Sequence, residues 1–221
     1  MPHPVSRLRA VVFDMDGLMF NTEEVYWQVG TELLRRRGHT FTRELNNAVM
    51  GRPPQACFEE MIRWHALDDP WEALAAESEE LFLTLLDDTL APMPGLVELL
   101  DRLERAAMPK AICTSSARRL LVAILARFGM EPRFQFTLTA EDITHGKPHP
   151  EIYEKAAEWF GLDPHEMLVL EDSATGCLAA ARAGAFVVAV PGELSREQGF
   201  GVASLVVDGL AHPRLYEALG L

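Results

Sequence analysis

The chain has 221 residues, of which 48% are hydrophobic and 24% are charged, a composition typical of one large globular domain or of a core domain with a small insert. Its formal net charge of −13 argues against binding to nucleic acid or to an anionic membrane surface, because both require basic residues. No apolar run is long enough to span a bilayer, the N-terminus lacks a secretory signal, and the three cysteines match no metal or redox spacing. We therefore expect a cytoplasmic protein.

The first predicted strand is Ala10–Phe13, four apolar residues that suit a parallel strand covered on both faces. Asp14 and Asp16 follow it directly, at the end of the strand where open α/β sheets bind their ligands. Gly17 then allows a tight turn. Two carboxylates this close repel each other, so we expect a cation between or beside them. The alternative is a polar strand end followed by a turn.

A helical pattern then extends from about residue 23 to about residue 90. Its apolar spacing and its Gly and Pro positions predict four helices, over about 23–37, 42–50, 54–66 and 70–90. We expect the arginines at 35–37 to form a solvated helix end. Arg52 follows the helix-ending Gly51 and is a candidate for a polar substrate contact, with a cation at a helix C-terminus as the alternative.

Strands and helices alternate after the turn-rich segment Pro92–Gly95. Strands are predicted over residues 111–113, 134–138, 167–170, 186–190 and 205–207, and helices over 96–106, 118–128, 151–160 and 174–183, with a last helix at the C-terminus. This rhythm predicts a doubly wound parallel sheet, a Rossmann-like α/β core. We expect the core to comprise residues 1–18 and 93–221, with a helical domain over residues 19–92 inserted after the first strand.

Three further predicted connections carry reactive side chains. Thr114–Ser116 places hydroxyls and backbone N–H groups before a helix, which suits an anion site or simple helix capping. Lys147 lies between Gly146 and Pro148, in a restricted loop of a chain that has only three lysines, although lysines in turns are usually solvated. Glu171 and Asp172 follow another strand and could bind a hard cation or favour a helix N-terminus. Together these groups should meet at one edge of the sheet.

The chain resembles the haloacid dehalogenase-like hydrolase superfamily over nearly its whole length. The motifs that carry the resemblance are Phe13–Leu18, Thr114–Ser116, Gly146–Pro150 and Glu171–Gly176 with the downstream Ala179–Gly184. The helical insert resembles the α-helical cap of that family. One departure is Asn21, where the first motif of the family usually ends in a second acid.

The resemblance implies a two-step chemistry. Asp14 would attack phosphorus and become an aspartyl phosphate, and Asp16 would protonate the leaving group and then activate water. Lys147 would neutralise the nucleophile and the phosphate. The resemblance also implies Mg²⁺ as the cofactor, held by Asp14, Glu171, Asp172 and the backbone carbonyl of Asp16. The residues that would bind the phosphoryl oxygens are Thr114 and Ser115, together with Lys147.

These roles predict a phosphatase that hydrolyses a small phosphorylated metabolite, such as a sugar phosphate or a similar phosphomonoester. A β-phosphoglucomutase-like mutase is the alternative, but such mutases usually have a histidine where Tyr26 stands and a lysine in the cap, and this insert has no lysine. An inert binding protein of the same fold is a third reading, which the intact set of acids, hydroxyls and lysine argues against. Tyr26 and Arg52 are the candidate substrate contacts in the cap, and the sequence leaves the oligomeric state open.

Overall fold

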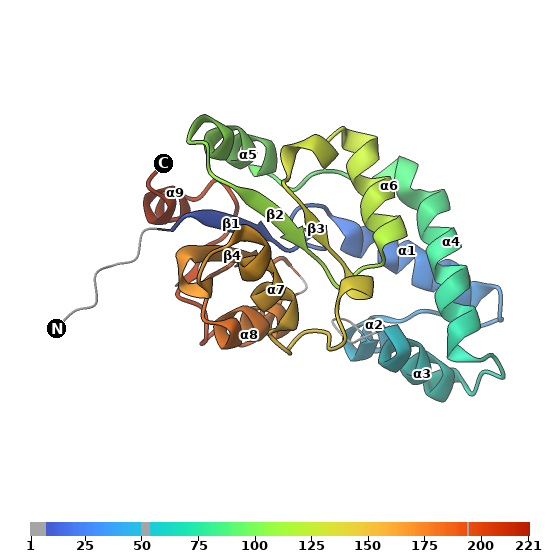
Figure 1. Ribbon diagram of the computed structural model, residues 1–221. Helices are drawn as coiled ribbons and strands as arrows, with labels where there is room; N and C mark the ends of the chain where they lie inside the picture. The colour runs from blue at the N-terminus through green and yellow to red at the C-terminus, as the bar shows by residue number, and fades with distance from the viewer. Residues whose placement is uncertain (1–7, 50–53, 194) are drawn as a thin grey trace. The chain divides into compact units, whose positions relative to one another are not determined.

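The computed structural model describes residues 8–49, 54–193 and 195–221 (Figure 1). The chain divides into two compact units: Met1–Phe20 with Pro92–Leu221, called the core unit here, and Asn21–Ala91, called the helical unit. Arg52 lies outside the described residues. Among the helices that the structure describes, none is both long and apolar enough to cross a membrane.

The core unit contains a sheet of six strands in the order β3-β2-β1-β4-β5-β6, and every neighbouring pair is parallel. This is the doubly wound topology that the sequence predicts, with β1 at the centre between β2 and β4. The strands are β1 (Ala10–Phe13), β2 (Lys110–Cys113), β3 (Thr137–Leu138), β4 (Met167–Glu171), β5 (Phe186–Ala189) and β6 (Leu205–Val206).

Helices cover both faces of this sheet. Ala10 and Val12 pack in one buried cluster with residues of α7 and α8, so Val11 and Phe13 point to the opposite face, where Figure 1 shows α5 and α6. The helices of the core unit are α5 (Leu96–Arg105), α6 (Arg118–Phe128), α7 (Glu151–Phe160), α8 (Ala174–Ala183) and α9 (Pro213–Leu219). Short 3-10 turns lie at Glu131–Arg133, Ala140–Asp142 and Pro164–Glu166.

The strand predicted over 134–138 is shorter than expected, because only Thr137–Leu138 forms regular strand structure. The residues before it follow the 3-10 turn at Glu131–Arg133. Gln135 N still donates to Lys110 O at 2.9 Å, so this segment borders β2 without completing a ladder. The alternation of apolar and polar residues over 134–138 indicated the segment correctly but not the length of its regular pairing.

The helical unit consists of α1 (Thr22–Arg35), α2 (Arg43–Val49), α3 (Pro54–His65) and α4 (Trp71–Thr89). Its core lies largely between α1 and α4, where Val25, Leu33 and Phe82 are buried. The two ends of this segment are adjacent: Asn21 N donates to Ala91 O at 3.1 Å, and the Asn21 side-chain oxygen accepts from Ala91 N at 2.6 Å. Asn21 therefore joins the start of the helical unit to its end.

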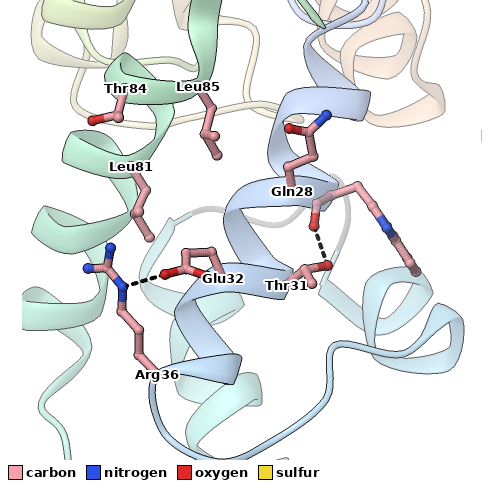
Figure 2. Close-up of a pocket in the computed structure, with 8 residues that line it drawn as sticks. Gln28, Thr31, Glu32, Arg36, Leu81, Thr84 and Leu85 are labelled. Atoms are coloured by element: carbon pink, nitrogen blue, oxygen red, sulfur yellow. Dashed lines mark hydrogen bonds and ion pairs between the residues drawn. The ribbon is translucent and has the colours of Figure 1, made fainter. Parts of the chain in front are cut away.

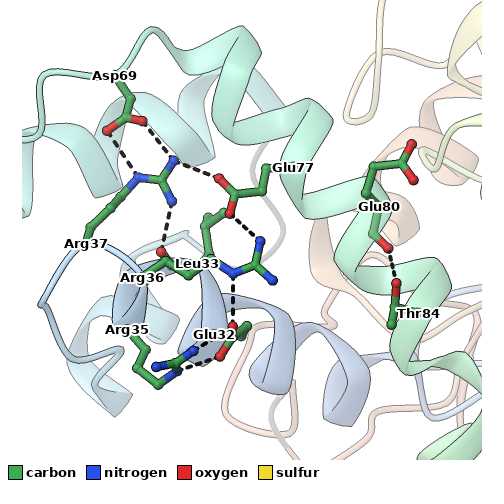
Figure 3. A network of polar contacts seen from close by, with 9 residues as sticks. All are labelled: Glu32, Leu33, Arg35, Arg36, Arg37, Asp69, Glu77, Glu80 and Thr84. Atoms are coloured by element: carbon green, nitrogen blue, oxygen red, sulfur yellow. Dashed lines mark hydrogen bonds and ion pairs between the residues drawn. The ribbon is translucent and has the colours of Figure 1, made fainter.

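The expectation that the arginines at 35–37 are solvated is wrong for Arg37, whose side chain is only 17% exposed. Its guanidinium donates to both carboxylate oxygens of Asp69, at 2.8 and 3.1 Å, and to Glu77 at 2.7 Å (Figure 3). Arg35, by contrast, is exposed and pairs with Glu32, one turn earlier. Arg37 lies beyond the last turn of α1, where the chain reverses, and this position brings it to residues near the start of α4.

Candidate active site

The candidate active site lies at the carboxyl ends of the three central strands of the core unit. Parallel pairing aligns Phe13, the last residue of β1, with Ile112 on β2 and with Leu170 on β4. The residues that follow these strands therefore start from the same edge of the sheet. Asp14 comes after β1, Thr114 after β2, and Glu171 closes β4.

Lys147 contacts all three of these strand ends. Its Nζ lies 2.5 Å from Asp14 Oδ1 and 2.7 Å from Glu171 Oε1, and it donates to Cys113 O at 3.2 Å. The side chains of Lys147, Asp14 and Glu171 are 6%, 9% and 0% exposed. The alternative that Lys147 is a solvated lysine in a turn is therefore excluded. The loop before α7 places its amine among the buried acids.

Glu171 is held from three directions. Besides Lys147, the Tyr153 hydroxyl donates to Oε1 at 2.5 Å, and the Ser173 hydroxyl donates to Oε2 at 3.0 Å. Tyr153 is fully buried on α7, and its ring centroid lies 5.2 Å from Lys147 Nζ. Sequence reasoning missed Tyr153, because its position in α7 indicates only a core residue and gives no sign of a partner for the hydroxyl.

The charges in this cluster are out of balance. The pKa of Asp14 is raised to about 8, mainly by burial; Lys147 opposes this shift, and the nearby Glu171 and Asp16 add to it. Burial lowers the pKa of Lys147, but the carboxylates of Asp14 and Glu171 outweigh this effect and raise it well above its ordinary value. One ammonium group does not compensate for so many buried carboxylates, so the cluster favours a further positive charge.

The residues present fit a hard metal ion. Asp14, Glu171 and Asp172 are all buried, and each offers an oxygen within 4.8 Å of the others. An all-oxygen set of carboxylates is the donor type that Mg²⁺ prefers. Both carboxylate oxygens of Glu171 already have partners, since Oε1 accepts two hydrogen bonds and Oε2 accepts one from Ser173.

Asp16 has one anchored and one unengaged oxygen. Its Oδ2 accepts hydrogen bonds from the Thr114 hydroxyl at 3.0 Å and from the Ser116 hydroxyl at 2.7 Å. Its Oδ1 is buried and has no hydrogen-bond partner among the residues that the structure describes. A carboxyl group fixed through one oxygen can exchange a proton through the other, which suits a general acid or base.

The structure gives the three hydroxyl residues after β2 different positions. Thr114 is fully buried and also accepts a hydrogen bond from Ser116 N at 3.0 Å. Ser115, which the sequence analysis singled out, is exposed, whereas Ser116, which it did not, contacts Asp16. All three belong to one polar run, and the sequence does not indicate which of them points towards the acid.

Within the helical unit, Tyr26 packs on Phe82 with ring centroids 4.7 Å apart and is 36% exposed. A groove of about 490 Å³ lies between α1 and α4 (Figure 2). Of its charged lining residues, Glu32 and Arg36 form an ion pair at 2.9 Å, so their charges compensate each other. We therefore place the candidate site at the buried acids and not in this groove.

Comparison with known proteins identifies the family of this chain. A family model described as haloacid dehalogenase-like hydrolase matches residues 11–190. A phosphorylated carbohydrates phosphatase from Thermotoga maritima is 28% identical, over 92% of this chain and 89% of that protein. A probable pseudouridine-5'-phosphatase from Drosophila melanogaster is 31% identical, over 90% of this chain and 89% of the relative. The fold resembles that of CbbY from Rhodobacter sphaeroides, solved with phosphate, at a TM-score of 0.85 and 24% identity, covering 97% of this chain and 100% of that one.

Proposed function

The chain belongs to the haloacid dehalogenase-like hydrolases, and from this premise we propose that it is a Mg²⁺-dependent phosphatase that acts through an aspartyl phosphate. Its substrate is a small phosphorylated metabolite, a sugar phosphate or a similar phosphomonoester, as the names of two relatives support. The observation that carries the proposal is the buried contact between Asp14 and Lys147 at 2.5 Å, at the carboxyl end of β1.

In the first step, a carboxylate oxygen of Asp14 forms a bond to phosphorus while the bond to the leaving oxygen breaks. Asp16 gives its proton to that leaving alkoxide. In the second step, Asp16 takes a proton from the water that attacks phosphorus, which releases phosphate and restores the Asp14 carboxylate. The unengaged Oδ1 of Asp16 is the atom placed to carry the proton in both steps.

Lys147 keeps a positive charge beside Asp14, where the substrate brings further negative charge. Asp14, Asp172 and Glu171, with the backbone carbonyl of Asp16, would hold Mg²⁺. When bound, the ion supplies the additional positive charge that an anionic nucleophile needs to approach an anionic phosphoryl group. Thr114 and Ser115 would contact the phosphoryl oxygens, with Ser115 the more exposed of the two.

The helical unit has the role of a cap in this proposal, shielding the first step from water. Tyr26 and Arg52 remain its candidate substrate contacts, and the predicted cap boundaries at residues 19 and 92 belong to the same proposal. A cytoplasmic location is supported by the odd and sparse number of cysteines, which are Cys57, Cys113 and Cys177.

The test is release of inorganic phosphate from p-nitrophenyl phosphate and from a panel of sugar phosphates, with Mg²⁺ and with a chelator. We expect turnover that requires Mg²⁺ and is lost in Asp14→Asn. Asp208→Asn is the matched control, because the Asp208 side chain is 90% exposed. Acid quenching during turnover should trap one phosphoryl group on wild-type protein and none on Asp14→Asn.

Two outcomes would contradict the proposal. Interconversion of a sugar 1-phosphate and a 6-phosphate that needs the bisphosphate, with no net release of phosphate, would identify a mutase. Absence of any Mg²⁺-dependent turnover across the panel would identify a binding protein. Tyr26 and the lack of lysine in residues 19–92 argue against the mutase.

A further inference from the structure

A second cluster of metal-binding side chains lies on the loop that leads into α7. His145, His149 and Glu151 each offer a ligand atom, and these atoms lie within 4.8 Å of one another. His145 Nδ1 is 3.1 Å from Glu151 Oε2, and the two imidazole rings are 4.6 Å apart. Both histidines are exposed, whereas Lys147 between them is buried among the acids. We propose that these three residues bind a transition-metal ion such as Zn²⁺, at a site separate from the catalytic acids.

The loop already holds these side chains together. Glu151 Oε1 accepts from Thr144 N at 2.9 Å, and Oε2 accepts from His145 N at 2.8 Å. His149 N donates to Gly146 O at 3.0 Å, closing a turn between the two histidines. An ion would therefore bind to ligands whose backbone is fixed, which lowers the entropy cost of ordering them.

Each ligand has an atom to offer. His149 Nδ1 accepts from Glu151 N at 3.3 Å, and a metal ion on this ring would replace that hydrogen bond, because a neutral imidazole has only one nitrogen with a free electron pair. Glu151 Oε1 is also paired with Lys155 at 3.0 Å, so Oε2 is the oxygen to coordinate an ion. The ion would take the place of the present contact between His145 Nδ1 and that oxygen. Three protein ligands leave a fourth position of a tetrahedral Zn²⁺ for water.

The donor types decide which ions this site accepts. Two imidazole nitrogens and one carboxylate oxygen suit Zn²⁺, Ni²⁺ or Cu²⁺, while Mg²⁺ prefers oxygen alone. The acids around Asp14 offer only oxygen, so the two sites favour different classes of ion. This difference makes them separable in solution, because excess Mg²⁺ can fill the first site without competing strongly for the second.

The test is equilibrium dialysis of the full-length protein against Zn²⁺ in the presence of excess Mg²⁺. We expect one Zn²⁺ equivalent to bind per chain. His145→Ala and His149→Ala should each weaken this binding by at least about tenfold, because even residues that only hydrogen-bond to metal ligands contribute about 10- to 100-fold to metal affinity. His165→Ala is the matched control, because His165 is an exposed histidine outside the cluster, and it should keep the wild-type affinity. Cu²⁺ in place of Zn²⁺ should show nitrogen hyperfine coupling in its electron paramagnetic resonance spectrum, and this coupling should be lost in the double variant.

Unchanged Zn²⁺ binding by the double variant His145→Ala/His149→Ala would overturn the proposal. So would binding that is lost in His39→Ala, because His39 stacks on His65 in the helical unit at 4.6 Å and would then be the true ligand. Circular dichroism and urea unfolding check that each variant is folded. The outcome is independent of the proposed phosphatase, since it is read as bound metal and not as turnover.

Discussion

Gly176 and Glu171 lie so close that a β-carbon at position 176 would be 1.9 Å from Glu171 Oε1. Gly176 is in the first turn of α8, and its N–H donates to Ser173 Oγ at 3.0 Å. The same Glu171 oxygen accepts hydrogen bonds from Lys147 and Tyr153. The missing side chain at this position is thus what gives the buried carboxylate its space.

Gly176→Ala should therefore damage the site directly. The new methyl group forces the Glu171 carboxylate away from Lys147, and a displacement of about 1 Å in a catalytic group can cost about 100-fold in rate. We expect kcat to fall by roughly 10- to 100-fold, and the free energy of unfolding to fall by about 1–3 kcal/mol from overpacking. Gly209→Ala, where nothing lies within 4 Å of the added carbon, is the control for steady-state kinetics and urea unfolding. A wild-type kcat in Gly176→Ala would show that the space at position 176 is not needed to place the Glu171 carboxylate.

Ser116→Ala should lower kcat more than it raises KM. The change removes the 2.7 Å hydrogen bond to Asp16 Oδ2 and leaves Thr114 as its remaining hydroxyl partner. A less firmly held acid transfers its proton less efficiently, and we expect a loss of about 10-fold or more, within the range ascribed to positioned acids and bases. Ser115→Ala, one residue earlier and exposed, should instead act mainly on KM if Ser115 contacts phosphate. Equal effects of the two variants on kcat would contradict the assignment of Ser116.

The raised pKa of Asp14 predicts how stability depends on pH. Asp14 has a pKa of about 8 in the metal-free folded protein, against an ordinary value of 3.8. Between these values the folded chain keeps a proton that the unfolded chain has lost, so this group makes the protein less stable as the pH rises. In chelator, the melting temperature of wild type should fall relative to that of Asp14→Asn between about pH 5 and about pH 8.

Mg²⁺ should reverse this trend, because a cation favours the ionised carboxylates. The rise in melting temperature on adding Mg²⁺ should then be larger near the upper end of that pH range than near the lower end. Differential scanning calorimetry with and without chelator measures both effects. Parallel pH profiles for wild type and Asp14→Asn would show that Asp14 titrates normally.

Arg37→Met should destabilise the helical unit. It removes the hydrogen bonds that tie Arg37 to Asp69 and Glu77, bonds that lower the pKa of Asp69. Leaving partly buried carboxylates without their partner should cost about 1–3 kcal/mol in unfolding free energy. Arg35→Ala should change stability little, since the Arg35 side chain is 68% exposed. Urea unfolding followed by circular dichroism compares the two, and equal losses would contradict the special role of Arg37.

The sheet and its helices could be predicted because each has a local signal in the sequence. The helices α6, α7 and α8 end at Gly129, Gly161 and Gly184, all with left-handed backbone angles that favour glycine. The acids could be placed together because parallel strands end at a common edge. Asp14 and Glu171 are accordingly bridged by one lysine, although they are far apart in the chain.

The contacts that could not be predicted depend on side-chain direction. Ser115 and Ser116 have the same chemistry, and only the local backbone decides which hydroxyl reaches Asp16. Tyr153 fits the apolar face of α7, so its polar contact with Glu171 has no signature of its own. Arg37 donates a hydrogen bond to Asp69, 32 residues later, because the packing of the helical unit brings the two residues together. Each of these contacts depends on tertiary structure that periodicity does not encode.

The neighbouring positions of Asn21 and Ala91 have an evolutionary consequence. Within the core unit, Phe20 and Pro92, the sequence neighbours of Asn21 and Ala91, form an antiparallel bridge. The chain therefore leaves the core unit and returns to it at adjacent positions. An insert whose two ends are adjacent can be deleted or replaced without changing the distance between the core residues that flank it. A lineage could thus acquire a new selectivity by exchanging these seventy-odd residues while inheriting the same chemical machinery unchanged.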